Sequence, residues 1–308
     1  MRWGDAWNGV PLAPGARIWI VGASGQVGQA CMRCWRDRYE VRGFVRTEWD
    51  ITRPEDVSRW ILDTSPLHRP DCIVNCAAMT RVDACETHPE DAERANAHGP
   101  GLLAYACERT GILLVHLSTD YVFSGTQETP LQEDTPPHPC NVYGRTKLEG
   151  ERRIVQQITS GRFLIVRTSW VFSLYRANFL TWVLERARAQ QQIPVVTDQT
   201  GCPTAADDLA DAIGRLLERG ARGWIHFRNG PPCSRYDQAR TILATFGLPV
   251  DLCVPVTRTA LPWKAQRPRY SVLHVGRYRA ITGMTPRPWQ DALAEMATLA
   301  GREFENYS

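Results

Sequence analysis

A glycine-rich loop near the start of the chain constrains its fold more than any other feature. The apolar run Arg17–Val21 leads into the sequence GASGQVG, and a helical pattern follows from Gln29. Glycines between a strand and a helix permit a tight turn, close approach of a pyrophosphate and close helix packing, while the helix N-terminus offers N–H donors. Such turns also serve packing alone, but here we expect a dinucleotide site. Its predicted residues are Gly22, Gly25, Gln26, Val27 and Gly28.

Short apolar runs alternate along the chain with segments of helical length. The runs are Arg17–Val21, Tyr39–Val45, Cys72–Cys76, Ile112–Leu117, Phe163–Arg167 and Trp224–Phe227. The helical segments include Glu90–Thr110, Asn141–Ile158 and Asp207–Arg219. Runs this apolar suit strands that are buried on both faces. The alternation therefore predicts an α/β fold with a doubly wound parallel sheet of the Rossmann type.

Length and local composition indicate two units. A chain of 308 residues corresponds to about two domains. The strand–helix pattern loosens after Val171, and Pro and Arg become frequent from Gly230 to Arg269. We expect a dinucleotide-binding domain over residues 1–170 and a smaller, discontinuous C-terminal substrate lobe mainly over 171–308. A strand near residues 223–228 is expected to return to the main sheet.

The composition argues against several classes of protein. The net charge of +3 is too weak to indicate nucleic acid or an anionic membrane as a partner. No apolar run approaches the ~18 residues of a membrane helix, and the first residues lack the apolar core of a signal peptide. The ten cysteines offer no matched pairs for a zinc site, so we expect reduced thiols and no metal. These features predict a soluble, cytoplasmic protein.

The end of the second strand bears on the choice of cofactor. An acidic residue there would bind the ribose hydroxyl of NAD, whereas Arg favours the 2′-phosphate of NADP. The sequence reads GFVRT from Gly43, with no carboxylate until Glu48. We therefore expect NADPH, with Arg46 on the 2′-phosphate. NADH, with Arg46 as an ordinary surface residue, is the alternative.

Tyr143 and Lys147 form a YxxxK motif. Residues four apart share a helix face, so the phenol and the ammonium are expected to converge. A cation about 4 Å away contributes about 4 kcal/mol at an effective dielectric near 20, enough to lower the phenol's pKa by about three units. Lys147 is one of only two lysines among 36 basic residues, which makes its placement informative. We predict Tyr143 as a proton donor to a carbonyl that receives hydride.

Hydroxyl and carboxylate groups follow the run Ile112–Leu117. Ser118, Thr119 and Asp120 stand where a parallel strand ends, and ligands bind at that edge of an open α/β sheet. Thr119 is predicted to bind the substrate carbonyl and to tune Tyr143, and Asp120 to hold a hydroxyl of a polar substrate. The alternative is that these residues merely end a strand.

Together these residues resemble the dTDP-4-dehydrorhamnose reductase family of extended short-chain dehydrogenases/reductases. The resemblance covers nearly the whole chain, from about Arg17 to Leu299. GxxGxxG and YxxxK are typical of the superfamily, and the other motifs of the narrower family. The matching stretches are GASGQVG, WDIT, VNCAAMTRVDACE, HLSTDYVFSGT, NVYGRTKLEGE, RTSWVF, DQTGCPT and RPRYSVL.

The resemblance implies that NADPH delivers hydride to C4 of a dTDP-4-keto-6-deoxyhexose in dTDP-rhamnose biosynthesis, a carbohydrate pathway. It implies catalytic roles for Thr119, Tyr143 and Lys147, with Lys147 also contacting the nicotinamide ribose. Adenine contacts are implied for Asp50 and Ile51, and cofactor contacts for Ala77 and Ala78. It implies that Asp120 binds a sugar hydroxyl and that Trp170 lines the sugar pocket. Contacts to the nucleotide diphosphate are implied for Asn178, Gln199 and Arg267, the last as its countercharge.

Alternatives remain open. Two other hypotheses for the function are a 4-ketoreductase of another nucleotide deoxysugar and a non-catalytic subunit resembling the regulatory subunit of methionine adenosyltransferase. The loop Ser173–Arg176 departs from the family and is expected to border the sugar. Some members use Mg²⁺ at a subunit contact, for which this sequence offers no site. The segment Met1–Gly15, with Trp3 and Trp7, is interpreted as a cover for an apolar patch, a homodimer contact or an unstructured extension.

Overall fold

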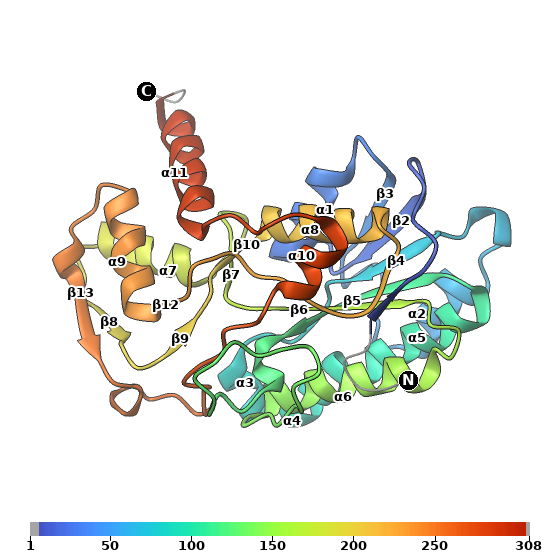
Figure 1. Cartoon of the computed structure of the whole chain (residues 1–308), viewed down its shortest axis with the longest axis horizontal. Helices are drawn as coiled ribbons and strands as arrows, with labels where there is room; N and C mark the ends of the chain where they lie inside the picture. The colour runs from blue at the N-terminus through green and yellow to red at the C-terminus, as the bar shows by residue number, and fades with distance from the viewer. Residues whose placement is uncertain (1–5, 306–308) are drawn as a thin grey trace.

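A seven-stranded sheet forms the centre of the larger part of the molecule (Figure 1). The computed structural model describes residues 6–305. The strand order is β1-β11-β6-β5-β4-β2-β3, and only β1 runs antiparallel to its neighbour. The predicted doubly wound parallel sheet is confirmed. Its strands are β1 (Ala6–Asn8), β2 (Arg17–Val21), β3 (Glu40–Phe44), β4 (Cys72–Asn75), β5 (Leu113–Thr119), β6 (Phe163–Thr168) and β11 (Ala221–His226).

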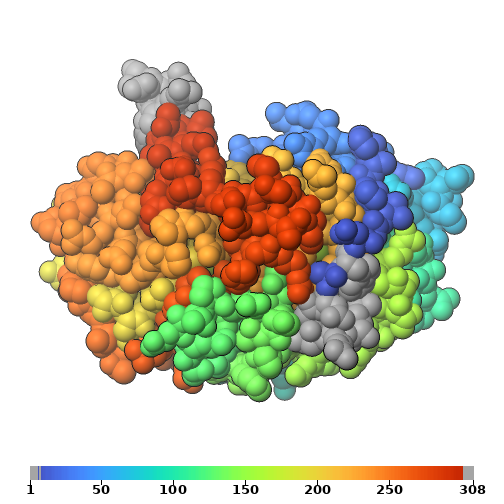
Figure 2. Space-filling model, in the orientation of Figure 1, coloured from blue at the N-terminus to red at the C-terminus, as the bar shows by residue number. Residues whose placement is uncertain are grey.

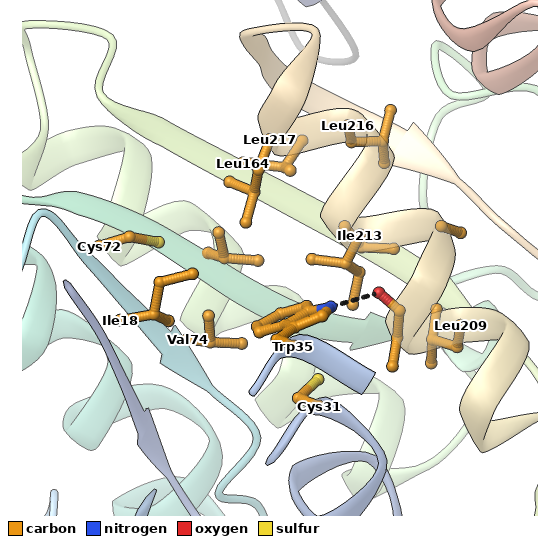
Figure 3. Packing of buried hydrophobic residues seen from close by; sticks show 14 of the residues in the cluster. Ile18, Cys31, Trp35, Cys72, Val74, Leu164, Leu209, Ile213, Leu216 and Leu217 are labelled. Carbon is orange, nitrogen blue, oxygen red and sulfur yellow. Dashed lines mark hydrogen bonds between the residues drawn. The ribbon is translucent and has the colours of Figure 1, made fainter. Parts of the chain in front are cut away.

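Helices cover both faces of this sheet. One face carries α1 (Gln26–Trp35), α8 (Ala206–Glu218) and α10 (Gly276–Thr282); the other carries α2 (Pro54–Val57), α5 (Gly99–Thr110) and α6 (Val142–Gln157) (Figure 1). Figure 3 shows Trp35 of α1 directed toward α8, where its indole N–H donates to the Ala210 carbonyl at 3.0 Å. The apolar stripe of α8, which includes Leu209 and Ile213, is fully buried against it. This packing holds the start of α1, and with it the glycine loop, in place.

The strand order places a binding crevice at one edge of the sheet. The chain passes from β2 outward to β3 and then returns to β4 on the other side of β2. At such a reversal the connections after β2 and β4 leave in opposite directions, and ligands bind beyond the carboxyl ends of these strands. The glycine loop follows β2, Ala77 follows β4, and Thr119 ends β5. The topology therefore brings the predicted cofactor and catalytic residues to one edge.

A smaller lobe lies beside the sheet, at the left of Figures 1 and 2. Its main elements are α7 (Phe179–Arg188), β8 (Ile193–Val196), α9 (Arg235–Thr245), β13 (Cys253–Val256) and α11 (Trp289–Glu305). Short strand pairs join it to the sheet: β7 (Val171–Phe172) with β10 (Thr204–Ala205), and β9 (Thr200–Gly201) with β12 (Cys233–Ser234). The domain boundary near residue 170 stays a prediction. The elements α8, β11 and α10 come after it in the chain but pack on the main sheet.

One helical segment differs from expectation. Glu90–Thr110 is not one regular helix: α4 (Pro89–Glu93) passes through a π-helical turn, Arg94–His98, into α5. The short helix α3 (Val82–Thr87) precedes it. Within residues 6–305, no helix has the length and apolar character needed to cross a membrane.

Residues 6–12 of the N-terminal segment make backbone hydrogen bonds with the main sheet and α8. Residues 6–8 form β1 on the edge of β11, and the N–H groups of Gly9 and Leu12 donate to the carbonyls of Gly220 and Leu217 at 2.6 and 2.9 Å. An unstructured extension is therefore the wrong interpretation for residues 6–12, because these backbone groups are paired. Trp3 and the side chain of Trp7 lie outside the described residues.

Candidate active site

The glycine loop has the geometry expected of a phosphate-binding turn. Gly22 has a φ of +77°, and a Cβ at this position would lie 2.6 Å from the backbone N of Ala77, so only glycine fits. The helix α1 begins at Gln26, three residues earlier than predicted, because Gly25 serves as its N-cap. The N–H groups of Gln26, Val27 and Gly28 thus belong to the first turn, where no helical carbonyl can accept from them.

The chain after β4 lies against this loop. The Asn75 side-chain oxygen accepts a hydrogen bond from the backbone N of Ala77 at 3.0 Å. Ala77 and Ala78 are both partly exposed beside Gly22. The structure therefore brings the predicted alanines to the glycine loop.

The predicted adenine end differs in detail from expectation. The Arg46 side chain is 83% exposed, and its Nε donates to the Asp50 carboxylate at 3.1 Å. Asp50 also accepts from the backbone N and the hydroxyl of Thr52, and Ile51 is buried in the core. Although burial raises it, the hydrogen bonds from Thr52 and Arg46 bring the pKa of Asp50 below its usual range. Arg46 therefore lies at the predicted adenine end as the partner of Asp50 in an ion pair.

Tyr143 meets Thr119 where β5 ends. Tyr143 lies in the first turn of α6, which follows the N-cap Asn141, and its phenol lies close to the side chain of Thr119. The Thr119 hydroxyl donates to Asp120 Oδ1 at 3.0 Å. Burial raises the pKa of Tyr143, the interaction with Thr119 opposes this, and the Asp120 charge adds to it. The phenol is therefore protonated at neutral pH.

Lys147 does not contact Tyr143 in the way predicted. Its Nζ donates to the Leu117 carbonyl at 2.6 Å and lies 3.1 Å from Nε2 of the buried His116. Burial lowers the pKa of Lys147 to about 8, against the attraction of Glu151. The predicted acidification of Tyr143 by Lys147 is wrong for this structure. The reason is that successive turns of α6 meet different residues of β5, so the phenol faces Thr119 and the ammonium faces Leu117.

Lys147 belongs to a network of buried polar side chains. His116 Nδ1 lies 3.1 Å from the Asn75 amide, which connects Lys147 to the segment beside the glycine loop. One turn beyond Lys147, the fully buried Glu151 forms an ion pair with Arg167 at 2.7 Å. Burial and the Lys147 charge hold the pKa of His116 well below its usual range, so its ring is neutral. The network fixes Lys147 relative to the sheet.

The structure gives definite contacts to two of the predicted substrate residues, Trp170 and Gln199. Trp170 has a left-handed backbone, with φ +47°, and its ring lies against Gly201. A Cβ added at Gly201 would lie 2.5 Å from Cε2 of the indole. Gln199 donates to the Tyr121 hydroxyl at 3.3 Å, and the Tyr121 and Tyr143 ring centroids are 5.8 Å apart. Within the described residues, Asp120 Oδ2 and Trp170 Nε1 are buried without a hydrogen-bond partner. Buried polar atoms of this kind favour a polar ligand.

Asn178 and Arg267 are already occupied by structural contacts. Asn178 is the N-cap of α7, and its amide also donates to the Ser173 and Arg176 carbonyls. Arg267 forms an ion pair with Asp83 at 2.7 Å and lies over the ring of Trp263. Both residues are thereby held by their own protein neighbours, which weakens the expectation that they bind the diphosphate.

The loop Ser173–Arg176 contacts the glycine loop. Ser173 Oγ donates to the Gln26 side chain at 2.9 Å, and Arg176 donates to the Ser24 carbonyl at 3.0 Å. Its described hydrogen bonds therefore point to the cofactor side and not to the sugar. This placement follows from β7, whose pairing with β10 carries the loop back over the start of α1.

Sequence reasoning missed Tyr121, His116 and Arg235. Tyr121 and His116 lie inside a motif that it did identify, HLSTDYVF, but there was no signal for their contacts. Arg235 begins α9, and its guanidinium lies 3.6 Å from the Trp170 ring centroid. As one of 34 arginines, it carried no signal in the sequence. Long-range packing alone brings it to this site.

Two other features of the molecule bear on the location of the site. Among residues 6–305, no cluster of three His, Cys, Asp or Glu side chains has the geometry of a metal site, and all ten cysteines are free. A surface cavity of about 940 Å³ opens beside α4 and α6, but neither Tyr143 nor Lys147 lines it. Thr119 and Tyr143, with Lys147 one turn further along α6, therefore define the candidate active site.

Comparison with known proteins identifies the family. The model of a family described as "RmlD substrate binding domain" matches residues 16–301. The chain belongs to the RmlD family of dTDP-4-dehydrorhamnose reductases. This confirms the resemblance drawn from the motifs.

Relatives of the RmlD family match over most of their length. The dTDP-4-dehydrorhamnose reductase of Burkholderia thailandensis is 35% identical over 90% of this chain and 96% of its own. A probable dTDP-4,6-dihydroxy-2-methyloxan-3-one 4-ketoreductase of Streptomyces antibioticus is 38% identical over 90% of this chain and 92% of its own. A Bacillus anthracis dTDP-4-dehydrorhamnose reductase in complex with NADP aligns with a TM-score of 0.86 and 31% identity, covering 92% of this chain and 98% of that one.

Proposed function

We propose that this protein reduces the C4 ketone of a dTDP-4-keto-6-deoxyhexose with hydride from NADPH, converting dTDP-4-dehydrorhamnose to dTDP-L-rhamnose. The proximity of the Tyr143 phenol to Thr119, with Lys147 one turn further along α6, carries this proposal. It supplies a proton donor at the edge of the sheet where the glycine loop lies. The relatives named above, one of them in complex with NADP, support the choice of substrate and cofactor.

The residues around the glycine loop fit a dinucleotide. Gly22 packs tightly on Ala77, whereas a Cβ on Gly25 would meet only the Gly22 carbonyl within 4 Å, at 3.2 Å, so the outer side of the turn is open. The first N–H groups of α1, at Gln26 and Val27, can donate to a pyrophosphate there. When bound, the cofactor supplies the hydride. Exposed Arg46 would pair with a 2′-phosphate beside the ribose, in exchange for Asp50.

The raised pKa of Tyr143 suits an acid in the direction of reduction. A ketone that gains hydride becomes an alkoxide, which is a stronger base than a phenolate. Tyr143 therefore needs to hold its proton until that charge develops and then transfer it to the oxygen at C4. Thr119, which donates to Asp120 and contacts the phenol, orients the donor. In this scheme Lys147 acts by binding the ribose and by its charge, and not by direct contact with the phenol.

Substitution of Tyr143 tests the proposal. We expect Tyr143→Phe to lower kcat by about 10²–10⁴-fold, because the positioned proton donor is lost. Consumption of NADPH is followed at 340 nm with dTDP-4-keto-6-deoxyglucose and the 3,5-epimerase. Tyr105→Phe, at an exposed tyrosine on α5, is the matched control and should turn over normally. Normal turnover by Tyr143→Phe with unchanged NADPH binding would show that Tyr143 is not the acid.

A second candidate function is 4-ketoreduction of another dTDP-deoxysugar. The Streptomyces antibioticus relative, with a different substrate in its name, is as similar to this chain as the rhamnose-forming relatives are. Omission of the 3,5-epimerase separates the two candidates. Turnover only in its presence supports the rhamnose route, whereas turnover of dTDP-4-keto-6-deoxyglucose without it supports the second candidate.

A further inference from the structure

We infer that Arg235 is the residue that binds the diphosphate of the nucleotide-sugar substrate. This inference rests on the proposed function and assigns one part of its substrate to a residue of the smaller lobe. Arg235 is the first residue of α9, directly after the N-cap Ser234 and its capping box with Asp237. The cap fixes the direction in which α9 begins, and with it the position of the guanidinium.

Arg235 lies among the residues that surround the candidate sugar site. Its guanidinium carbon is 3.6 Å from the ring centroid of Trp170 and 4.8 Å from that of Phe179. Its charge interacts with Asp120 and Tyr121, which follow Thr119 directly in the chain. The side chain is partly exposed, so a ligand can reach it. Arg235 thus lies beside Trp170, near the residues that follow Thr119.

The hydrogen-bonding capacity of Arg235 is largely unused. Within the described part of the chain it forms no ion pair, and its described side-chain hydrogen bond is from Nη1 to Gln238 Oε1 at 2.9 Å. A guanidinium stacked on an aromatic ring keeps its N–H groups in the plane of the stack, directed outward from the ring edge. The remaining donors are thus available to a planar or tetrahedral oxyanion. Burial lowers the pKa of Arg235 to about 10, so the group is still a cation at neutral pH.

The surrounding charges favour an anion over a neutral sugar hydroxyl. Arg267 repels Arg235 electrostatically, while Asp120 attracts it without forming an ion pair. Within the described residues, the guanidinium of Arg235 is therefore a cation without an ion pair. Because Arg267 is bound to Asp83, its charge is largely balanced, whereas that of Arg235 is not. The diphosphate is the anionic part of the proposed substrate, and Arg pairs with phosphate oxygens through two parallel hydrogen bonds.

Nucleotide binding without turnover tests this assignment. Titration calorimetry with thymidine diphosphate and with thymidine compares wild type with Arg235→Gln. We expect the variant to bind thymidine diphosphate about 10–100-fold more weakly, since charge-assisted hydrogen bonds are lost, and thymidine with unchanged affinity. Arg240→Gln, an exposed arginine of the same helix, is the matched control and should bind both as wild type does.

The possible outcomes separate this inference from the proposed function. Unchanged affinity of Arg235→Gln for thymidine diphosphate would overturn the inference and leave the reductase activity standing. An equal loss of affinity for thymidine would also overturn it, because the effect would not depend on the phosphates. NADPH affinity reports whether the variant is folded. If Arg235→Gln fails to bind NADPH, Arg235→Lys, which keeps the charge, takes its place. This variant should bind thymidine diphosphate 3–10-fold more weakly and thymidine with unchanged affinity. Unchanged affinity of Arg235→Lys for thymidine diphosphate would overturn the inference. Failure of the wild type to reduce any dTDP-4-keto sugar would instead contradict the proposed function.

Discussion

Asp120 shows how burial sets the chemistry of a single residue in this site. Burial raises the pKa of Asp120 to about 6, although the hydrogen bond with Thr119 opposes the shift. In the unfolded chain an aspartate titrates near pH 4. The unfolded chain therefore loses this proton at a lower pH than the folded protein does. The contribution of Asp120 to stability is full below about pH 4 and is lost as pH rises through 6.

We therefore predict that Asp120→Asn stabilises the protein in a pH-dependent manner. The asparagine keeps the acceptor for Thr119 but carries no charge, so its advantage over wild type should grow between pH 4 and 6 and level off at about 2–3 kcal/mol. Chemical denaturation at a series of pH values measures this difference. Asp251→Asn, at an exposed aspartate of the smaller lobe, should show no such trend. A difference for Asp120→Asn that is constant with pH would mean that the carboxyl does not titrate near 6.

The contacts of Tyr143 were predictable and those of Lys147 were not. The i, i+4 spacing does place both residues on the face of α6 that packs on β5, and the end of β5 does bring Thr119 to the phenol. Which atom of the strand each side chain meets depends on the register of helix against strand. That register is set by the whole interface, including the buried pair Glu151–Arg167. Spacing within one motif carries no information about it.

At the scale of elements, the junction between β9 and β7 depends on one glycine. The ring of Trp170 occupies the space that a side chain at residue 201 would need, and the left-handed backbone of Trp170 holds the ring there. Gly201→Ala would place a methyl group 2.5 Å from Cε2 and Cζ2 of the indole. Real Cβ atoms do not approach a ring this closely, so the indole or the β9–β12 pair has to move.

We predict that Gly201→Ala costs about 1–3 kcal/mol of stability, the usual range for overpacking, and raises KM for the nucleotide sugar. Denaturation and steady-state kinetics measure the two effects. The same substitution made in a Trp170→Phe background should cost less, because the smaller ring leaves room, and the double-mutant cycle gives the coupling. Equal costs in both backgrounds would place the strain elsewhere.

The strand β1 shows where prediction of elements failed. The six parallel strands each overlap an apolar run that the sequence marks, although β3, with Glu40 and Arg42, is only partly buried. Residues 6–8 are too few for any pattern, and they form a strand only because β11 presents an open edge beside them. Backbone pairing of this kind depends on the neighbour and not on the side chains. The start of α1 at Gln26 was also missed, because the N-cap conformation of Gly25 decides it.

At the scale of the whole molecule, a segment of the smaller lobe is tied to the helices that carry the active site. Asp83 of α3 accepts hydrogen bonds from the backbone N–H groups of Lys264 and Ala265, at 3.0 and 2.9 Å, and from Arg267. Asn141, the N-cap of α6, donates to the Gln266 carbonyl at 2.7 Å. Tyr143 follows Asn141 by two residues, in the first turn of α6. The segment 264–267 therefore positions the smaller lobe against the first turn of the catalytic helix.

Substitution of Asp83 should separate the two halves of the binding site. Asp83→Asn keeps an acceptor for the backbone but turns an N–H group toward Arg267, which loosens the segment. We expect KM for the dTDP-sugar to rise about tenfold, equivalent to about 1.4 kcal/mol, with little change in KM for NADPH, because the glycine loop is held by α1 and α8 and not by this segment. Steady-state kinetics with each substrate varied in turn provides the measurement, with Asp251→Asn as control. An equal rise in both constants would show that the lobes act as one unit, and the dependence of sugar binding on this tie would then be refuted.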